Sequence, residues 1–254
     1  MNTIEVTSPF DGSIVGNVPY GSVPEVEAAL ELAQATFLDH KNALPTYKRV
    51  EILEKVVKIM SSQVEELTKL CASEGGKPWV DSQVEVHRAI NGVKLAIEAL
   101  GAREGKEIAM GHTASSANRM AYTFKEPIGV VAAISAFNHP LNLAIHQVIP
   151  AIAVGCSVII KPATQTPMSA IKVIEILKEA GLPNGWAQVV VCDRKGGELL
   201  ATSPKIDALT FIGSGKVGWY LNSKVASGTR VALEHGGVAP VIVEADADID
   251  ELIT

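Results

Sequence analysis

The chain has two regions that differ in the spacing of their hydrophobic residues. In the first third, apolar positions recur every three or four residues, as at Val50, Leu53, Val57 and Met60, which predicts amphipathic helices. From Gly129 onward, short apolar runs of strand length alternate with helical stretches. Such alternation predicts parallel strands joined by helices that cover both faces of the sheet.

The pattern sets approximate bounds for each expected element. The expected strands are the apolar runs 129–136, 157–161, 187–192, 208–212 and 231–233. Between them, helices are expected at about 140–154, 167–180, 196–202 and 215–226. Upstream, helices are expected after Ser22, from Thr46 through Cys71 to a stop at Gly75-Gly76, and over about 78–103. Residues 105–128 flank a polar, turn-like centre and are expected to form a hairpin.

Composition excludes several classes of protein. A net charge of -6 argues against a nucleic-acid partner, which would need a basic surface. The longest apolar runs reach only about half of a membrane span, and the amino terminus lacks the features of a signal peptide. The three cysteines, Cys71, Cys156 and Cys192, lack metal-ligand spacing, so we expect buried thiols, a cytoplasmic protein and no metal site.

Polar residues follow the expected strands, where open α/β sheets bind their ligands. Asn138 follows the first strand, and its amide could donate to an oxyanion or simply hold a turn. Lys161 ends the second strand, and it could bind a ribose or phosphate or merely be solvated. Glu234 ends the fifth strand as a catalytic carboxylate or as one half of an ion pair.

A glycine-rich turn, FIGSGKVG, follows the fourth strand and would let backbone N–H groups approach a phosphate. It is not a Walker A loop, because Val217 stands where Ser or Thr would hold magnesium. Nor is it a hydrolase elbow, because Ile212 occupies the first glycine position of that motif.

Four segments in this order resemble the aldehyde dehydrogenase superfamily: EPIGVVAAISAFNHP, IIKPATQTP, FIGSGKVG and ALEHGGVAPVIVEADAD. The likeness covers the whole chain, and lactaldehyde, succinate-semialdehyde and phosphonoacetaldehyde dehydrogenases look most similar. It implies an α/β fold with a Rossmann-like open parallel sheet and flanking helices. The implied parts are an N-terminal helical segment of the cofactor domain (1–104), an oligomerisation β-hairpin (105–128) and an NAD(P)-binding core (129–254).

The resemblance also implies residue roles. Asn138 would hold the thiohemiacetal oxyanion, and Glu234 would activate the nucleophile or the hydrolytic water. Lys161 would bind the adenosine ribose. The other implied cofactor residues are Ile134, Ser135, Ala136 and Phe137 beside the nicotinamide, and Thr164, Gly197, Gly213, Ser214 and Val217 beside the rest of the cofactor. We expect Asn138, Lys161, Ser214 and Glu234 to surround a single crevice.

The main departure from the family pattern is the missing nucleophile. The family's catalytic cysteine lies well after the glutamate, whereas this chain ends at Thr254. We therefore expect the catalytic domain to be absent and this polypeptide alone to be inactive. One alternative is a non-catalytic dinucleotide-binding fragment, and another is a CoA-acylating enzyme, against which Glu234 counts. The full-length enzyme is expected to be a homodimer or homotetramer.

Other departures bear on cofactor and substrate. Thr164 stands where NAD-preferring members often have glutamate, and Arg194 and Lys195 add positive charge, so we expect NADP to be accepted as well as NAD. His139 and His235 are polar replacements at the active edge. Four residues suggest a small polar or anionic aldehyde: Arg88, His139, Asn142 and His146. Alternatively, His146 and Arg88 only satisfy hydrogen bonds between packed helices.

Overall fold

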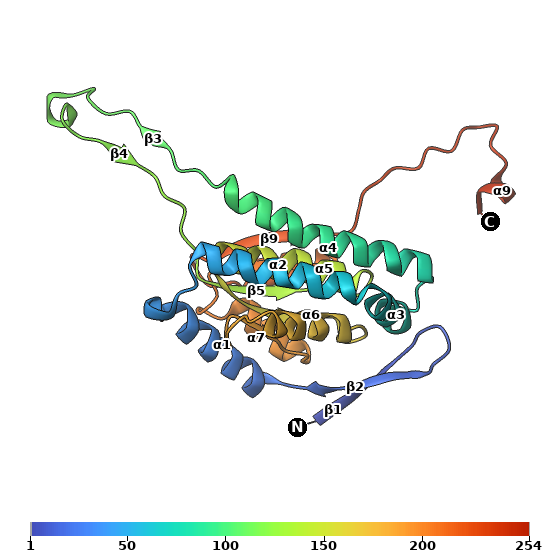
Figure 1. Ribbon diagram of the computed structural model, residues 1–254. Helices are drawn as coiled ribbons and strands as arrows, with labels where there is room; N and C mark the ends of the chain where they lie inside the picture. The colour runs from blue at the N-terminus through green and yellow to red at the C-terminus, as the bar shows by residue number, and fades with distance from the viewer. Residues whose placement is uncertain (1, 254) are drawn as a thin grey trace.

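The computed structural model describes residues 2–253 and is built around a five-stranded parallel sheet (Figure 1). The strand order is β7-β6-β5-β8-β9. Their bounds are Val130–Ile134 (β5), Ser157–Lys161 (β6), Ala187–Val189 (β7), Ala208–Ile212 (β8) and Arg230–Glu234 (β9). The chain builds the sheet outward from β5 to β7 and then returns to the other side of β5. The order therefore reverses between β5 and β8, which is the topological switch point of the sheet.

Helices cover both faces of the sheet (Figure 1). On one face lie α2 (Thr46–Ser62), α3 (Val64–Gly75), α4 (Trp79–Gly101), α5 (Pro140–Val154) and α6 (Met168–Glu179). On the other face lie α1 (Val23–Leu38), α7 (Arg194–Thr202) and α8 (Gly215–Asn222). Successive residues of β5 serve different cores, with Val131 and Ala133 in the first and Val130 and Ala132 in the second. This double burial explains why the strands are continuous apolar runs.

Residues 2–20 form two strands, so the expectation that residues 1–104 are helical is wrong for this stretch. β1 (Asn2–Thr7) and β2 (Ile14–Tyr20) pair antiparallel, and Gly21 bridges to Cys192 just beyond β7. Val6, Val18 and Val191 form a small third core beneath them. The Pro-Phe-Asp-Gly sequence between two β-branched runs is a hairpin signal that the helical pattern downstream obscured.

The helix expected from Thr46 through Cys71 is two helices. α2 ends at Ser62 and α3 begins at Val64, with Gln63 outside helical geometry between them (φ -111°, ψ 20°). The apolar positions keep their spacing across the break, so the period alone does not reveal it. The stop at Gly76 is confirmed, because this residue adopts the left-handed conformation (φ 61°) that favours glycine.

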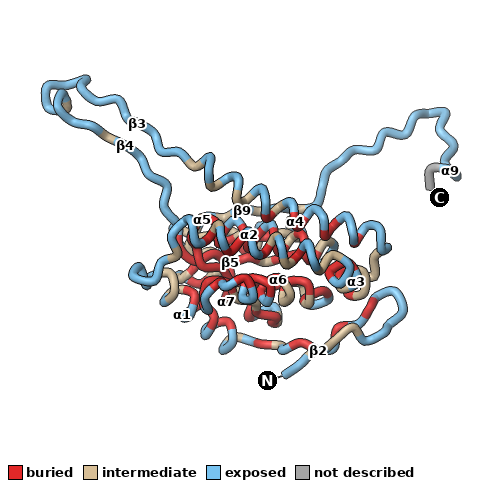
Figure 2. The backbone as a smooth tube through the Cα atoms, in the orientation of Figure 1, coloured by how far each residue is buried: buried red, intermediate tan, exposed pale blue. Residues whose placement is uncertain are grey.

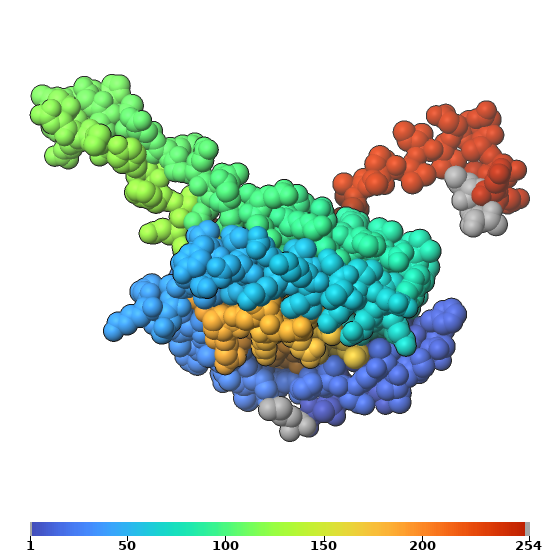
Figure 3. Space-filling view, in the orientation of Figure 1, coloured from blue at the N-terminus to red at the C-terminus, as the bar shows by residue number. Residues whose placement is uncertain are grey.

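Two segments project from the body, as Figures 2 and 3 show. β3 (Glu107–Ile108) and β4 (Ala121–Tyr122) pair antiparallel in the first, with the 3-10 turn η2 (Ala114–Ser116) at its tip. We call residues 105–128 the arm; most of its residues are exposed. The second segment follows β9, is exposed, and ends in α9 (Ile249–Ile253). A further 3-10 turn, η1 (His40–Asn42), links α1 and α2.

Residues 2–253 contain neither a candidate membrane span nor a candidate metal site. None of their helices is long and apolar enough to cross a bilayer. Their His, Cys, Asp and Glu side chains also form no group of three or more that could hold a metal ion. The polar groups of interest gather instead at the carboxyl edge of the sheet.

Candidate active site

The carboxyl ends of four neighbouring strands meet at one edge of the sheet. Ile134 of β5 pairs with Lys161 of β6 on one side and with Phe211 of β8 on the other. Glu234 of β9 then pairs with Ile212 of β8. This edge includes the switch point between β5 and β8, where open α/β sheets bind ligands.

A pocket of about 280 Å³ opens beside the end of β6, and we call it the nucleotide pocket. Its lining includes five of the expected cofactor residues, Ile134, Lys161, Thr164, Gly197 and Val217. Arg194, in the first turn of α7, also lines it. The lining therefore carries two cations, two carboxylates (Asp193 and Glu198) and the neutral hydroxyl of Thr164.

Lys161 is mostly buried in this pocket. Burial lowers the pKa of its ammonium group, and Nζ donates to the Pro162 carbonyl oxygen at 3.2 Å. A Cβ added to Gly197 would come within 3.0 Å of the Lys161 Cδ and Cε atoms, so the glycine makes room for the lysine stem. An ammonium has three donors, which leaves Lys161 able to bond a ribose hydroxyl or a phosphate.

The glycine-rich turn after β8 starts helix α8. The Ser214 Oγ accepts from the Val217 backbone N–H at 3.5 Å. The Gly213 N–H donates to the Glu234 carbonyl oxygen at 3.0 Å, so this amide is already engaged. A Cβ at Gly213 would lie 2.7 Å from the Phe211 ring. Packing against Phe211 thus requires the glycine, whose N–H is already engaged and is not free for a ligand.

The residues expected beside the nicotinamide follow β5 in different environments. Ser135 is buried, and its N–H donates to the Lys161 carbonyl oxygen at 3.0 Å, which extends the β5–β6 ladder. Ala136 is half-buried, whereas Phe137 is exposed. Only part of this stretch therefore faces an open surface.

Asn138 and Phe137 line a second hollow, of about 900 Å³. Its opposite wall includes the N-terminal hairpin, Glu74 and Lys77. Thr164 lines this hollow and the nucleotide pocket as well, so the two are neighbours. Asn138 is exposed here, with its amide available to a ligand.

Glu234 lines a third hollow, of about 420 Å³, between α4 and α5, together with His146 and Arg103. The expectation of a single crevice around all four residues is therefore wrong. The reason is strand alternation: Leu233 packs in the core under α1, α7 and α8, so Glu234 points to the opposite face. Lys161 lies on the α7 and α8 side of the same edge.

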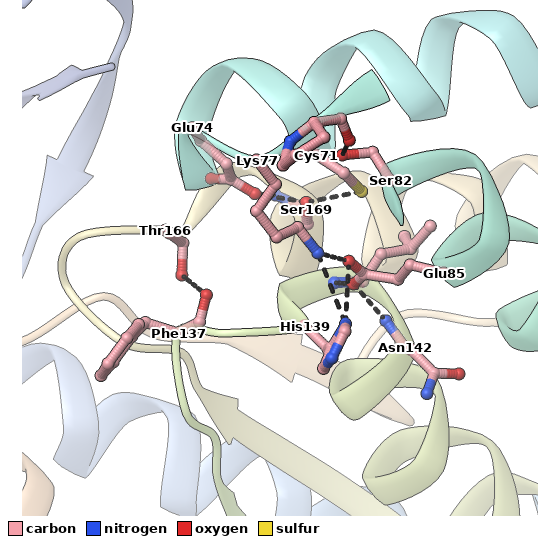
Figure 4. A network of polar contacts seen from close by, with 12 residues as sticks. Cys71, Glu74, Lys77, Ser82, Glu85, Phe137, His139, Asn142, Thr166 and Ser169 are labelled. Carbon is pink, nitrogen blue, oxygen red and sulfur yellow. Dashed lines mark hydrogen bonds and ion pairs between the residues drawn. The ribbon is translucent and has the colours of Figure 1, made fainter. Parts of the chain in front are cut away.

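Buried charges that the sequence analysis missed hold the loop after β5 (Figure 4). The Glu85 side chain, on α4, is 0% exposed. Its Oε1 accepts the backbone N–H groups of Leu141 at 2.9 Å and Asn142 at 3.0 Å. Its Oε2 pairs with the Lys77 ammonium group and lies 3.5 Å from the His139 Nδ1.

Glu74, on α3, binds the first N–H groups of α6 in the same way (Figure 4). Its carboxylate accepts the Met168 N–H at 2.8 Å, the Ser169 N–H at 2.9 Å and the Ser169 hydroxyl. Burial raises the pKa of Glu74. The sequence does carry a signal for both residues: an acid stands on the apolar face of α3 and another on that of α4. A carboxylate is costly to bury there without partners.

The four candidate substrate residues do not share one surface. Arg88 is exposed on α4, and His146 lines the third hollow with Glu234. His139 begins α5 beside Lys77 and Glu85. Asn142 is buried, and its Oδ1 has no hydrogen-bond partner among the described residues.

His235 was expected as a polar residue at the active edge, but its side chain packs against aromatic rings instead. Its ring packs edge-on against Trp219, with centroids 5.6 Å apart, and lies 6.5 Å from Phe211. A Cβ at Gly218 would come within 2.4 Å of the His235 Nε2. The ring therefore fills a site on α8 rather than an active-site surface.

All three cysteines are buried. Burial raises the pKa of Cys71 to about 12 and that of Cys192 to about 11. Such thiols are poor nucleophiles at neutral pH, because the thiolate is the reactive form. The geometry thus offers an amide, a carboxylate and a nucleotide pocket, but no accessible thiol among these three residues.

Comparison with known proteins fits this arrangement. The profile of the aldehyde dehydrogenase family matches residues 1–254. The chain belongs to this family. This aldehyde dehydrogenase chain is 36% identical over 249 residues to the 3-sulfolactaldehyde dehydrogenase of Priestia megaterium, and 35% identical over 254 residues to the NADP(+) succinate-semialdehyde dehydrogenase GabD of Escherichia coli. Each alignment covers 98% of the chain and 51% of the relative, so the chain spans about half the length of the curated relatives it matches.

Solved structures of the family share the fold of this aldehyde dehydrogenase chain. An NADP-dependent glyceraldehyde-3-phosphate dehydrogenase from Bacillus halodurans, complexed with NADP, has a TM-score of 0.89 at 32% identity, over 97% of this chain and 52% of that one. An aldehyde dehydrogenase from Physcomitrella patens, in complex with the reaction product succinate, has a TM-score of 0.89 at 33% identity, over 94% of this chain and 50% of that one. The α/β cofactor-binding fold and the family's use of NAD or NADP are thereby confirmed.

Proposed function

We propose that this chain supplies the nucleotide pocket, the oxyanion donor and the catalytic carboxylate of an enzyme that oxidises a small polar or anionic aldehyde to its acid. The observation that carries the proposal is the sheet edge, which has Lys161 and Thr164 on one face and Glu234 with His146 on the other. Two relatives support the substrate class, because their names specify aldehydes that carry a sulfonate or a carboxylate.

Each residue has a distinct part in this proposal. Lys161 and Ser214 bind the nucleotide, and the nicotinamide, when bound, supplies the hydride acceptor. The Asn138 amide donates to the oxyanion that forms at the aldehyde carbon. Glu234 accepts a proton from the water that hydrolyses the thioester, which favours hydrolysis over transfer to CoA.

The thioester requires a cysteine nucleophile. Because Cys71, Cys156 and Cys192 are buried, the thiol has to come from a residue other than these three. These 254 residues alone are therefore expected to bind the cofactor without turning over an aldehyde.

The nucleotide pocket suits a 2′-phosphate. Thr164 brings no negative charge, and Arg194 lines the pocket together with Lys161. The two carboxylates of the lining have partners of their own, because Asp193 accepts the Gly196 N–H and Glu198 pairs with Lys224. A guanidinium and an ammonium group are the usual partners of a phosphate. We therefore infer that NADP binds at least as tightly as NAD.

The proposal extends to the oligomeric state of the enzyme and to its cellular compartment. Exposed apolar side chains on the arm support a role in forming a homodimer or homotetramer. Three free thiols suit the reducing conditions of the cytoplasm.

Calorimetric titration of the purified chain with NADP and NAD tests the proposal. We expect NADP to bind, and Lys161→Met to weaken that binding by about tenfold, as loss of a charge-assisted hydrogen bond would. Lys172→Met is the matched control, because Lys172 pairs with Glu66 away from the pocket. Absence of binding by both nucleotides would refute the proposed function.

A further inference from the structure

Helix α5 begins without a cap of its own. His139 is the N-cap residue, but its side chain makes no capping hydrogen bond. Pro140 follows at the first helical position and has no N–H. The next two N–H groups, of Leu141 and Asn142, donate instead to the buried Glu85. A carboxylate from α4 therefore fixes where α5 starts, and with it the place of Asn138 two residues earlier.

Lys77 balances the charge of Glu85. Its side chain is 17% exposed, and its ammonium group pairs with the Glu85 Oε2. The turn that carries it is fixed from outside, because a Cβ at the preceding Gly76 would lie 2.6 Å from Pro9 of the N-terminal hairpin. Lys77 and Asn138 also line the same hollow.

The position of Lys77 constrains the ring of His139. Their Nζ and Nδ1 atoms lie 3.4 Å apart. An ammonium group can only donate, so this contact requires an unprotonated Nδ1. The proton of the neutral ring is then on Nε2, and the His139 side chain is 44% exposed.

The opposite arrangement would have Nδ1–H donating to the Glu85 Oε2 at 3.5 Å. That oxygen already accepts from Lys77, and an N–H there would face the ammonium group. Among the described residues, Lys77 and Glu85 are the charged groups in polar contact with His139. The geometry favours donation from Lys77.

We propose that Lys77 and Glu85 are positioning residues that set the start of α5 and hold the His139 ring with Nε2–H as an outward donor beside Asn138. That donor would bond an oxygen of the anionic aldehyde. Only this last statement rests on the proposed function; the state of the ring does not.

Nitrogen-15 NMR of the histidine rings in the 254-residue chain tests the proposal directly. In the wild type, neutral His139 should carry its proton on Nε2. In Lys77→Met, only the Glu85 carboxylate remains beside the ring, so the neutral ring should move its proton to Nδ1 and donate it to Glu85. Lys77→Arg keeps a donor and should keep the Nε2–H tautomer.

Lys48→Met is the matched control, because Lys48 pairs with Glu51 on an exposed helix surface. It should leave the His139 resonances unchanged. If Lys77→Met does not fold, the tautomers of the wild type and of Lys77→Arg still decide the question. A proton on Nδ1 in either protein, or an unchanged Nε2–H tautomer in a folded Lys77→Met, would overturn the proposal. Titrating the same samples with NADP separates this result from failure of the proposed function.

Discussion

Lys161 and Glu234 end strands of one sheet but face opposite sides of it. Strand alternation alone produces this separation, since neighbouring positions on a strand point to opposite faces. In the proposed function, a cofactor held by Lys161 on the α7 and α8 side would have to cross the sheet edge to bring its reactive ring near Glu234. Asn138 follows β5, which lies between β6 and β8 in the sheet.

Thr164 is the residue at which we expect cofactor choice to change. In Thr164→Glu, a carboxylate enters the nucleotide pocket and repels a 2′-phosphate, while it can bond a free ribose hydroxyl. The ratio of NADP to NAD affinity should fall by about tenfold or more, which corresponds to ~1.4 kcal/mol. Calorimetric titration with both nucleotides measures it.

Gln165→Glu is the matched control for this change. It adds the same charge one residue further along, in the second hollow and outside the lining of the nucleotide pocket. An equal fall in the ratio for both variants would mean that general charge, rather than the pocket, selects the cofactor.

At the residue scale, the sequence pointed to residues that the fold brings together. Lys161 was expected from its place at the end of an apolar run, and Thr164 and Gly197 from the family resemblance; all three line one pocket. Their roles in cofactor binding stay predictions. Prediction failed for Asn142 and His235, because packing by residues distant in the sequence decides whether a polar side chain faces a ligand. The ring of His235, for example, lies against Trp219 and Phe211.

At the scale of elements, the first turns of helices α5 and α6 are capped by side chains from other helices. Each follows a strand of the candidate site, and neither N-cap residue makes a side-chain capping hydrogen bond. Glu85 from α4 and Glu74 from α3 satisfy the free N–H groups instead. The loops after β5 and β6 can thus keep their polar side chains for a ligand.

Glu74 gives a prediction for the pH dependence of stability. Burial raises its pKa above the ordinary value of 4.5, so the folded state holds the proton more tightly than the unfolded state. Its contribution to the free energy of unfolding is therefore greatest at low pH and falls as pH rises from 4.5 through the raised pKa. Gln cannot titrate, so the stability of wild type minus that of Glu74→Gln should decrease over this range.

Urea unfolding of both proteins between about pH 4 and pH 8 measures this difference. Glu66→Gln is a suitable control, because Glu66 forms an exposed ion pair with Lys172. A difference between wild type and Glu74→Gln that grows with pH would contradict the expectation, since it would mean that the N–H donors of α6 outweigh burial.

The alternation of strands and helices after residue 128 was predictable, because an apolar run of strand length and a helical period differ clearly in sequence. The element bounds of β6, β8 and α5 match the expected ranges. The N-terminal hairpin and the break at Gln63 were not predicted. The hairpin has a local turn signal, but it packs on Val191, a partner that no local period encodes. The break at Gln63 leaves the apolar spacing unchanged.

The whole molecule consists of a packed body from which the arm and the C-terminal segment project (Figures 1 and 3). The arm carries Met120 and Phe124, which are 81% and 83% exposed. Its two short strands bury little of their own surface, and an isolated hairpin is marginally stable in water. A partner surface would stabilise it.

We expect the double variant Met120→Gln, Phe124→Gln to weaken self-association by about tenfold or more, because two large apolar side chains would no longer be buried. Sedimentation across a range of protein concentrations measures this. Phe10→Gln is the control, since Phe10 is equally exposed on the turn of the N-terminal hairpin. A wild-type chain that stays monomeric throughout would count against assembly through the arm.

The bridge between Gly21 and Cys192 has a consequence for biosynthesis. The N-terminal hairpin is synthesised before its docking site near β7, which follows some 170 residues later along the chain (192 minus 21 is 171). At translation speeds of about 5–20 residues per second, the hairpin stays undocked for roughly ten seconds or more. During that interval nascent chains should be most vulnerable to proteases and most dependent on chaperones.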